Sequence, residues 1–147
     1  MFVWCEADSD SNFELLGMAQ HTQSPLWRDA SELSVQIERA VQRFSRYHKY
    51  ALGADLRSST RLLLRAITLA ARKDAIALHA RREVILLAEQ IRAELALAHA
   101  LKAFPCLQDF ATAVALVGAV GKQSEGWLKQ AKRERPAAAP APGAARA

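Results

Sequence analysis

Basic side chains at helical spacing are the residues of this sequence best suited to chemistry, and that chemistry is phosphate binding. Arg57, Arg61 and Arg65 recur every four residues, which places them along one slowly turning side of a helix. No acidic residue stands four positions from any of them, so their charges are not neutralised within that helix. Phosphate contacts from such side chains give affinity without sequence recognition and weaken steeply as salt rises.

Further basic residues extend this candidate site to other parts of the chain. The alternative interpretation is a solvated surface of mixed charge that binds nothing. The candidate residues for binding a nucleic acid or a partner are Arg39, Arg43, Arg46, Arg57, Arg61, Arg65, Lys122, Lys129, Lys132 and Arg133.

The overall charge favours the same class of partner. The chain carries 20 Lys and Arg against 15 Asp and Glu, a formal net charge of +5. Residues 1–28 hold one base and four acids, so the rest of the chain is more basic than the whole. A basic body of this kind indicates a polyanionic ligand or an acidic protein surface.

Motifs that would indicate an enzyme are not found. The chain has no GxGxxG, Walker, HExxH or GxSxG motif, and its two cysteines, Cys5 and Cys106, form no CxxC pair. His79 and Glu83 share a helix face, but a di-iron bundle needs Glu-x-x-His motifs, and none occurs. We therefore expect no catalytic centre, no metal and no cofactor, with a metal- or ligand-binding bundle enzyme as a remote alternative.

Length and hydropathy predict one soluble domain. The 147 residues, of which 51% are hydrophobic, suffice for a single core. No secretory signal opens the chain, and no apolar run approaches the ~20 residues of a membrane-spanning helix. We expect a cytoplasmic protein with reduced thiols and no membrane partner.

The elements that must position the basic residues are four helices. Residues 54–104 contain no glycine or proline and are rich in alanine, leucine and arginine, so this stretch should fold into a helical hairpin. A capping box at residues 29–32 predicts the start of a preceding helix near Asp29 or Ser31. The first expected helix runs from there to about residues 46–50, and the second from Leu52–Asp55 to Ala71. The third begins at the cap Asp74 and reaches Ala103, where Phe104-Pro105 stops it. The fourth runs from Leu107 to Lys132.

These helices predict an all-α, up-down-up-down four-helix bundle over residues 29–133. Residues 1–28 are expected to form a variable, partly ordered leader, and residues 134–147 a disordered Ala/Pro tail. The residues predicted to face the core are Leu33, Ile37, Ala40, Val41, Phe44, Leu52, Leu56, Ser59, Leu63, Ala66, Ile67, Ala70, Ala80, Val84, Leu87, Ile91, Leu95, Ala98, Leu101, Phe110, Val114, Val117, Gly121 and Leu128.

Two segments resemble a known family. They are Phe44–Arg57, with the sequence FSRYHKYALGADLR, and Val120–Lys129, with the sequence VGKQSEGWLK. In order and spacing they are similar to the small four-helix bundle family that includes the accessory variability determinant (Avd) of diversity-generating retroelements, and to proteins encoded in intervening sequences of large-subunit ribosomal RNA genes. The resemblance covers about residues 30–132. Ser45 stands where the family usually has proline, and Ala96 where a basic residue is common.

The resemblance implies a non-catalytic function. Avd-like proteins are homo-oligomeric rings, usually pentamers, that bind a reverse transcriptase and its template RNA or cDNA and support mutagenic reverse transcription. The intervening-sequence relatives imply an alternative, a self-associating helical scaffold with no nucleic-acid role.

The two segments also contain residues with expected structural roles. Tyr50, Leu52 and Gly53 are expected to shape the turn between the first two helices, where glycine allows positive φ or close packing. Trp127 beside Gly126 is expected to pack a large ring over a small neighbour, either in the bundle or between subunits, rather than to stack on a base.

Overall fold

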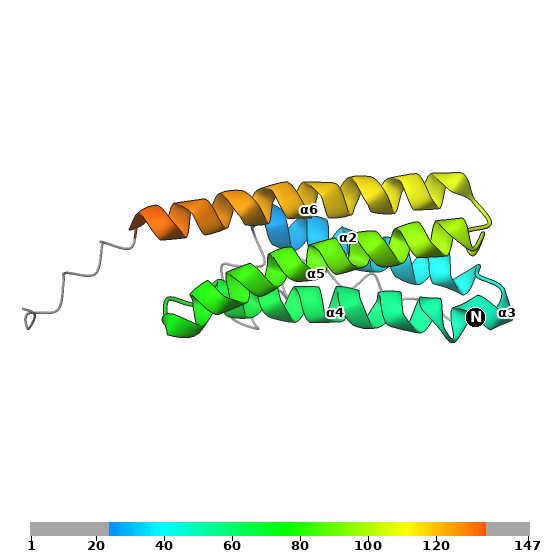
Figure 1. The fold of residues 1–147 in the computed structure, drawn as a ribbon, viewed down its shortest axis with the longest axis horizontal. Coiled ribbons are helices and arrows are strands. Elements are labelled where there is room, and N and C mark those ends of the chain that lie inside the picture. The colour runs from blue at the N-terminus through cyan, green and yellow to red at the C-terminus, as the bar shows by residue number, and fades with distance from the viewer. Residues whose placement is uncertain (1–23, 135–147) are drawn as a thin grey trace, which may run out of the picture.

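A computed structural model describes residues 24–134 as a bundle of long antiparallel helices (Figure 1). The elements are α2 (Pro25–Gln42), the short α3 (Arg46–Lys49), α4 (Leu52–Ala70), α5 (Ala75–Ala100) and α6 (Leu107–Glu134). Within this range there is no strand, so the predicted all-α bundle of four long helices is confirmed. The predictions for residues 1–23 and 135–147 lie outside the described residues.

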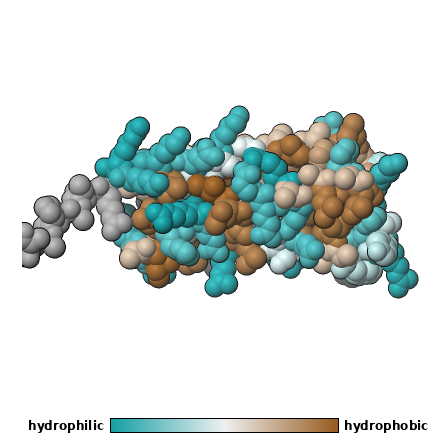
Figure 2. Space-filling model, viewed as in Figure 1, coloured by the Kyte–Doolittle hydropathy of each residue, from teal (hydrophilic) through white to brown (hydrophobic). Residues whose placement is uncertain are grey.

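The four long helices form a closed ring of neighbours. Helix α2 contacts α4 and α6, and α5 contacts the same two helices. The α2–α4 pair and the α5–α6 pair are therefore opposite sides of the bundle. In space-filling form, one side of the molecule shows hydrophilic side chains over much of its area, with apolar surface near the end where α5 passes into α6 (Figure 2). No helix in residues 24–134 is long and apolar enough to span a bilayer.

The first long helix begins earlier than the capping box at residues 29–32 predicts. Ser24 is its N-cap, with the Oγ atom accepting a hydrogen bond from the Trp27 amide at 3.1 Å, and Pro25 occupies the first helical position. The Asp29 carboxylate is used elsewhere, because it accepts a hydrogen bond from Gln123 of α6 at 2.5 Å. Residues 25–28, assigned to the leader from sequence, therefore belong to the bundle.

Helix α5 ends at Ala100 rather than at Ala103. Its cap Asp74 accepts from the Ile76 amide at 3.2 Å, as the sequence predicts. At the other end, Lys102 adopts a left-handed φ of 56°, and the Ala103 amide donates to the Ala98 carbonyl at 2.9 Å. This is a Schellman motif, which ends a helix without the following proline.

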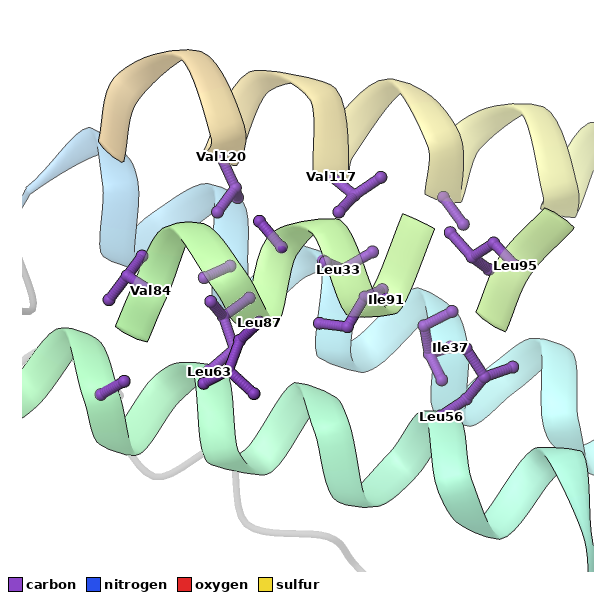
Figure 3. Packing of buried hydrophobic residues seen from close by; sticks show 14 of the residues in the cluster. Leu33, Ile37, Leu56, Leu63, Val84, Leu87, Ile91, Leu95, Val117 and Val120 are labelled. Atoms are coloured by element: carbon purple, nitrogen blue, oxygen red, sulfur yellow. The ribbon is translucent and has the colours of Figure 1, made fainter. Parts of the chain in front are cut away.

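Aliphatic side chains from all four long helices fill the core (Figure 3). Each long helix contributes side chains that are 0% exposed. They include Leu33 and Ile37 of α2, Leu63 of α4, Ile91 of α5 and Val117 of α6. The predicted core positions are buried or half-buried with two exceptions. Leu101 is 49% exposed because the helix has already ended, and Val114 is 36% exposed.

An aromatic cluster closes one end of the bundle. The ring of Phe104 lies 5.0 Å from Phe44 and 5.6 Å from Phe110, and His99 stacks on Phe110 at 4.2 Å. These contacts join the end of α2, the loop after α5 and the first turns of α6. The short helix α3 lies at this same end (Figure 1).

Candidate nucleic-acid interface

The structure divides the predicted basic residues between two groups of helices. Arg39, Arg46, Arg61 and Arg65 belong to α2, α3 and α4, whereas the lysines of α6 belong to the opposite pair. One side of α6 contacts α2, through Asp109 with Arg43 and Gln123 with Asp29. Another side contacts α5, where Gly121 lies close to Arg92. The predicted candidates therefore fall into two groups, one on α2, α3 and α4 and the other on α6.

Arg57 does not contribute a free charge. Its Nε atom lies 2.9 Å from Glu38 Oε2, and its side chain is only 24% exposed. This pair joins α4 to α2 across a sequence separation of 19 residues. Although α4 offers Arg57 no acidic partner, an acid of α2 pairs with it, so the row Arg57, Arg61 and Arg65 is not wholly unpaired.

Arg43 is also held within the bundle. Its Nη2 atom lies 2.7 Å from Asp109 Oδ2, and the aspartate side chain is 16% exposed. The contact ties the end of α2 to the first turn of α6, where a carboxylate is also favoured by the helix dipole. Arg43 therefore serves the packing of helix ends.

Four of the predicted residues on helices α2, α3 and α4 keep exposed charges. One of them, Arg65, also lines a small pocket with Glu83 of α5. Arg39, Arg46, Arg61 and Arg65 are exposed and form no ion pair with any residue of the range 24–134. We call these four residues the α2–α4 basic face. Consecutive arginines four residues apart on α4 are separated by about 6 Å along the axis, so the face can follow an extended polyanion.

The remaining candidates form a second cluster on α6. Lys122, Lys129, Lys132 and Arg133 are all exposed. Figure 2 shows long hydrophilic side chains projecting from this part of the molecule. Glu125 and Glu134 on the same helix dilute the positive charge, since both are exposed among these bases. We call these four basic residues the α6 basic end.

The predicted structural residues of the first turn behave differently from one another. A Cβ atom on Gly53 would lie 2.5 Å from Val41 Cγ1, so this glycine provides close packing of α4 against α2 within an ordinary helix. Leu52 packs half-buried against the core. Tyr50, in contrast, is 73% exposed and contributes little to the packing of the turn.

Trp127 packs inside the bundle, which is one of the two arrangements predicted from the sequence. Its ring packs against the core cluster, and the Arg81 guanidinium lies over it at 4.6 Å. The same arginine donates from Nε to the Ala70 carbonyl at the end of α4. Gly126 does not take part, because a Cβ atom there would meet nothing within 4 Å.

Sequence reasoning missed Tyr47. Its side chain is 83% exposed, and it lies in α3 between Arg46 and Lys49. Tyr50 follows directly as the C-cap of this helix. The signal was the alternation of basic and aromatic residues from position 46 to position 50. The sequence analysis instead assigns Tyr50, with Leu52 and Gly53, to the turn between the first two helices.

Other kinds of site have less support in residues 24–134. No group of three or more His, Cys, Asp or Glu residues in this range is placed to hold a metal ion. A surface pocket of about 460 Å³ at the α4–α5 turn is lined by Arg72, Lys73, Asp74, Arg81 and Glu134, among others. Its charges are mixed, and Arg72 already pairs with Asp74 at 2.7 Å.

Comparison with family models, with curated proteins and with solved structures gives no match to this chain. The functional hypothesis therefore depends on the two sequence motifs and on the surfaces described above.

Proposed function

We propose that this chain is a non-catalytic accessory protein of a diversity-generating retroelement. In this function it binds the reverse transcriptase and its template RNA or cDNA and supports mutagenic reverse transcription in the cytoplasm. The observation that carries the proposal is the α2–α4 basic face, whose four arginines have no ion-pair partner in residues 24–134. Exposed arginines without an ion-pair partner suit contacts to a phosphate backbone.

The sequence motifs supply the identity of the partner. The Phe44–Arg57 and Val120–Lys129 segments resemble the Avd family, and the all-helical bundle is the fold that this resemblance implies. Co-purification with a reverse transcriptase encoded beside the gene, together with its transcript, tests this part. Recovery of neither one from cells that express both would contradict it.

Salt-dependent RNA binding tests the α2–α4 basic face directly. For the variant Arg61→Gln/Arg65→Gln, we expect weaker binding to a single-stranded RNA oligonucleotide. The slope of log K against log salt should flatten by about 1.4, since each phosphate contact to a single strand contributes about 0.7. Fluorescence anisotropy titrations at several salt concentrations provide the measurement.

Two matched variants give this experiment its control. Arg43→Gln/Arg57→Gln removes the same formal charge from residues already in ion pairs, so the slope should change less. Lys129→Gln/Lys132→Gln removes the same formal charge from the α6 basic end. If only this last variant flattened the slope, the interface would lie on the opposite side of the bundle from the one proposed. Equal flattening by all three variants would contradict a localised face.

Self-association is the second part of the proposal, in the form of a homo-oligomeric, pentameric ring. Four exposed apolar residues, Leu97, Leu101, Leu107 and Val114, lie where α5 passes into α6. Figure 2 shows apolar surface at this end, and also in the other half of the molecule. The same observation favours the alternative function, a self-associating scaffold without nucleic acid, because apolar surface of this kind marks protein contacts.

Light scattering of the purified chain tests the oligomer. We expect a mass near five times the 16.2 kDa of one chain at micromolar concentration, and a lower mass for the variant Leu97→Lys/Leu107→Lys. Both leucines are about half exposed or more, so the monomer fold should survive the change. A monomeric wild-type chain would contradict the ring. An oligomer that binds no RNA would favour the scaffold.

A further inference from the structure

Helix α3 presents two aromatic rings to solvent at one end of the bundle. Tyr47 is 83% exposed and Tyr50 is 73% exposed, the two largest values among the exposed large hydrophobic residues in the range 24–134. The Tyr47 ring also contacts His48 edge-to-face, with centroids 5.2 Å apart. Single exposed aliphatic residues need no explanation, but two neighbouring aromatic rings this accessible form a surface on which another flat group can stack.

The chain on both sides of α3 is fixed in the core. Phe44, just before the helix, is 4% exposed and packs against Phe104. Gly53, just after it, is buried against Val41, and a Cβ atom there would also lie 3.4 Å from the His48 carbonyl oxygen. The tyrosines are therefore held on a short, anchored segment, so binding does not have to order a loose loop.

Most of the charge near the two rings is positive, although Asp55 lies in the first turn of α4 and Asp109 pairs with Arg43 at the same end of the bundle. Arg46 and Lys49 lie in α3 itself, and the sequence contains no acidic residue between Glu38 and Asp55. Farther along α4 lie Arg61 and Arg65 of the α2–α4 basic face. Aromatic platforms flanked by a basic track are how proteins hold single strands, with bases on the rings and phosphates on the cations.

We propose that α3 is a stacking site for unpaired nucleotides, in which Tyr47 and Tyr50 take bases while Arg46 and Lys49 contact the adjoining phosphates. The inference deepens the proposed nucleic-acid function and depends on it. It specifies the ligand as single-stranded RNA or cDNA, because bases inside a duplex are stacked on one another and cannot offer their faces. It also places one end of the bound strand at α3, with the strand continuing along α4.

Conservative and disruptive substitutions at the two tyrosines test the stacking site. For the variant Tyr47→Leu/Tyr50→Leu we expect an affinity for single-stranded RNA reduced by about fivefold to a hundredfold for each of the two stacked bases that are lost. The variant Tyr47→Phe/Tyr50→Phe keeps both rings and should bind like the wild type. Both positions are exposed, so circular dichroism and thermal melting should show that each variant folds.

The salt dependence separates stacking from charge. The leucine variant should leave the slope of log K against log salt unchanged, because no cation is removed. Duplex RNA of the same sequence should bind equally to wild type and both variants. Single-stranded DNA should lose affinity in parallel with single-stranded RNA, since both offer base faces.

The possible failures are distinguishable. If the leucine variant binds single strands like the wild type, while Arg61→Gln/Arg65→Gln flattens the slope, the stacking site is wrong and the proposed function stands. If the leucine variant loses only the reverse transcriptase in co-purification, α3 is a protein contact and the inference is overturned. A wild-type chain that binds no nucleic acid at low salt overturns both proposals.

Discussion

Leu63→Ala is expected to lower the free energy of unfolding by about 2–5 kcal/mol, the range for truncating a buried leucine. The Leu63 side chain is 0% exposed and belongs to the cluster in which all four long helices meet. Figure 3 shows Leu63 and Leu87 in the space between α4 and α5. The loss combines the transfer free energy of the removed methyl groups with the cavity that rigid neighbouring helices leave behind. Urea denaturation followed by circular dichroism measures it.

The neighbouring residue provides a matched control. Leu62 has the same side chain in the same helix but is 44% exposed. Leu62→Ala should therefore cost well under half as much as Leu63→Ala. Equal costs at the two positions would contradict the core described here, because they would require Leu62 to be as closely packed as Leu63.

The sequence predicted the fold well because each long helix carries a complete apolar stripe. Leu33, Ile37 and Val41 on α2, and Val84, Ile91 and Leu95 on α5, recur at helical spacing and all prove buried. Such periodicity depends only on local geometry, so a single sequence reveals it.

Helix ends were harder to predict because capping depends on competition between neighbouring signals. Asp29 offered a capping box, but Ser24 and Pro25 provide an earlier start, and Asp29 bonds to Gln123 far along the chain. Leu101 continued the apolar stripe of α5, yet the left-handed backbone at Lys102 ended the helix first. A non-glycine residue in that conformation gives no local signal in the sequence.

The candidate site was predicted only in part, for a related reason. Rules for pairs four residues apart in one helix cannot detect Arg57 with Glu38, or Arg43 with Asp109, because those pairs depend on how the helices align. The exposed rings of Tyr47 and Tyr50 likewise follow from the position of α3 outside the core. What remains of the predicted set is two groups of exposed basic residues without an ion pair in residues 24–134, the α2–α4 basic face and the α6 basic end.

Gly53→Ala is expected to destabilise the protein by about 1–3 kcal/mol, the range for overpacking a core. In most helical positions this change stabilises, by up to about 1 kcal/mol. Here the new methyl group would lie 2.5 Å from Val41 Cγ1, and Val41 is 0% exposed. A β-branched side chain in a helix has one strongly preferred rotamer, so Val41 cannot rotate away at low cost. The free energy of unfolding from urea denaturation is again the measurement.

Two further variants decide whether this contact is the cause. Gly126→Ala makes the same change in α6, where a Cβ atom meets nothing within 4 Å, and should stabilise by up to about 1 kcal/mol. In the variant Val41→Ala/Gly53→Ala the clash is removed, so the two changes should cost less together than the sum of their separate costs, by about 0.5–3 kcal/mol. Additive costs would contradict the contact. Because His48 lies against the same glycine, a clash here would also displace α3 and weaken single-stranded RNA binding without the loss of any charge or ring.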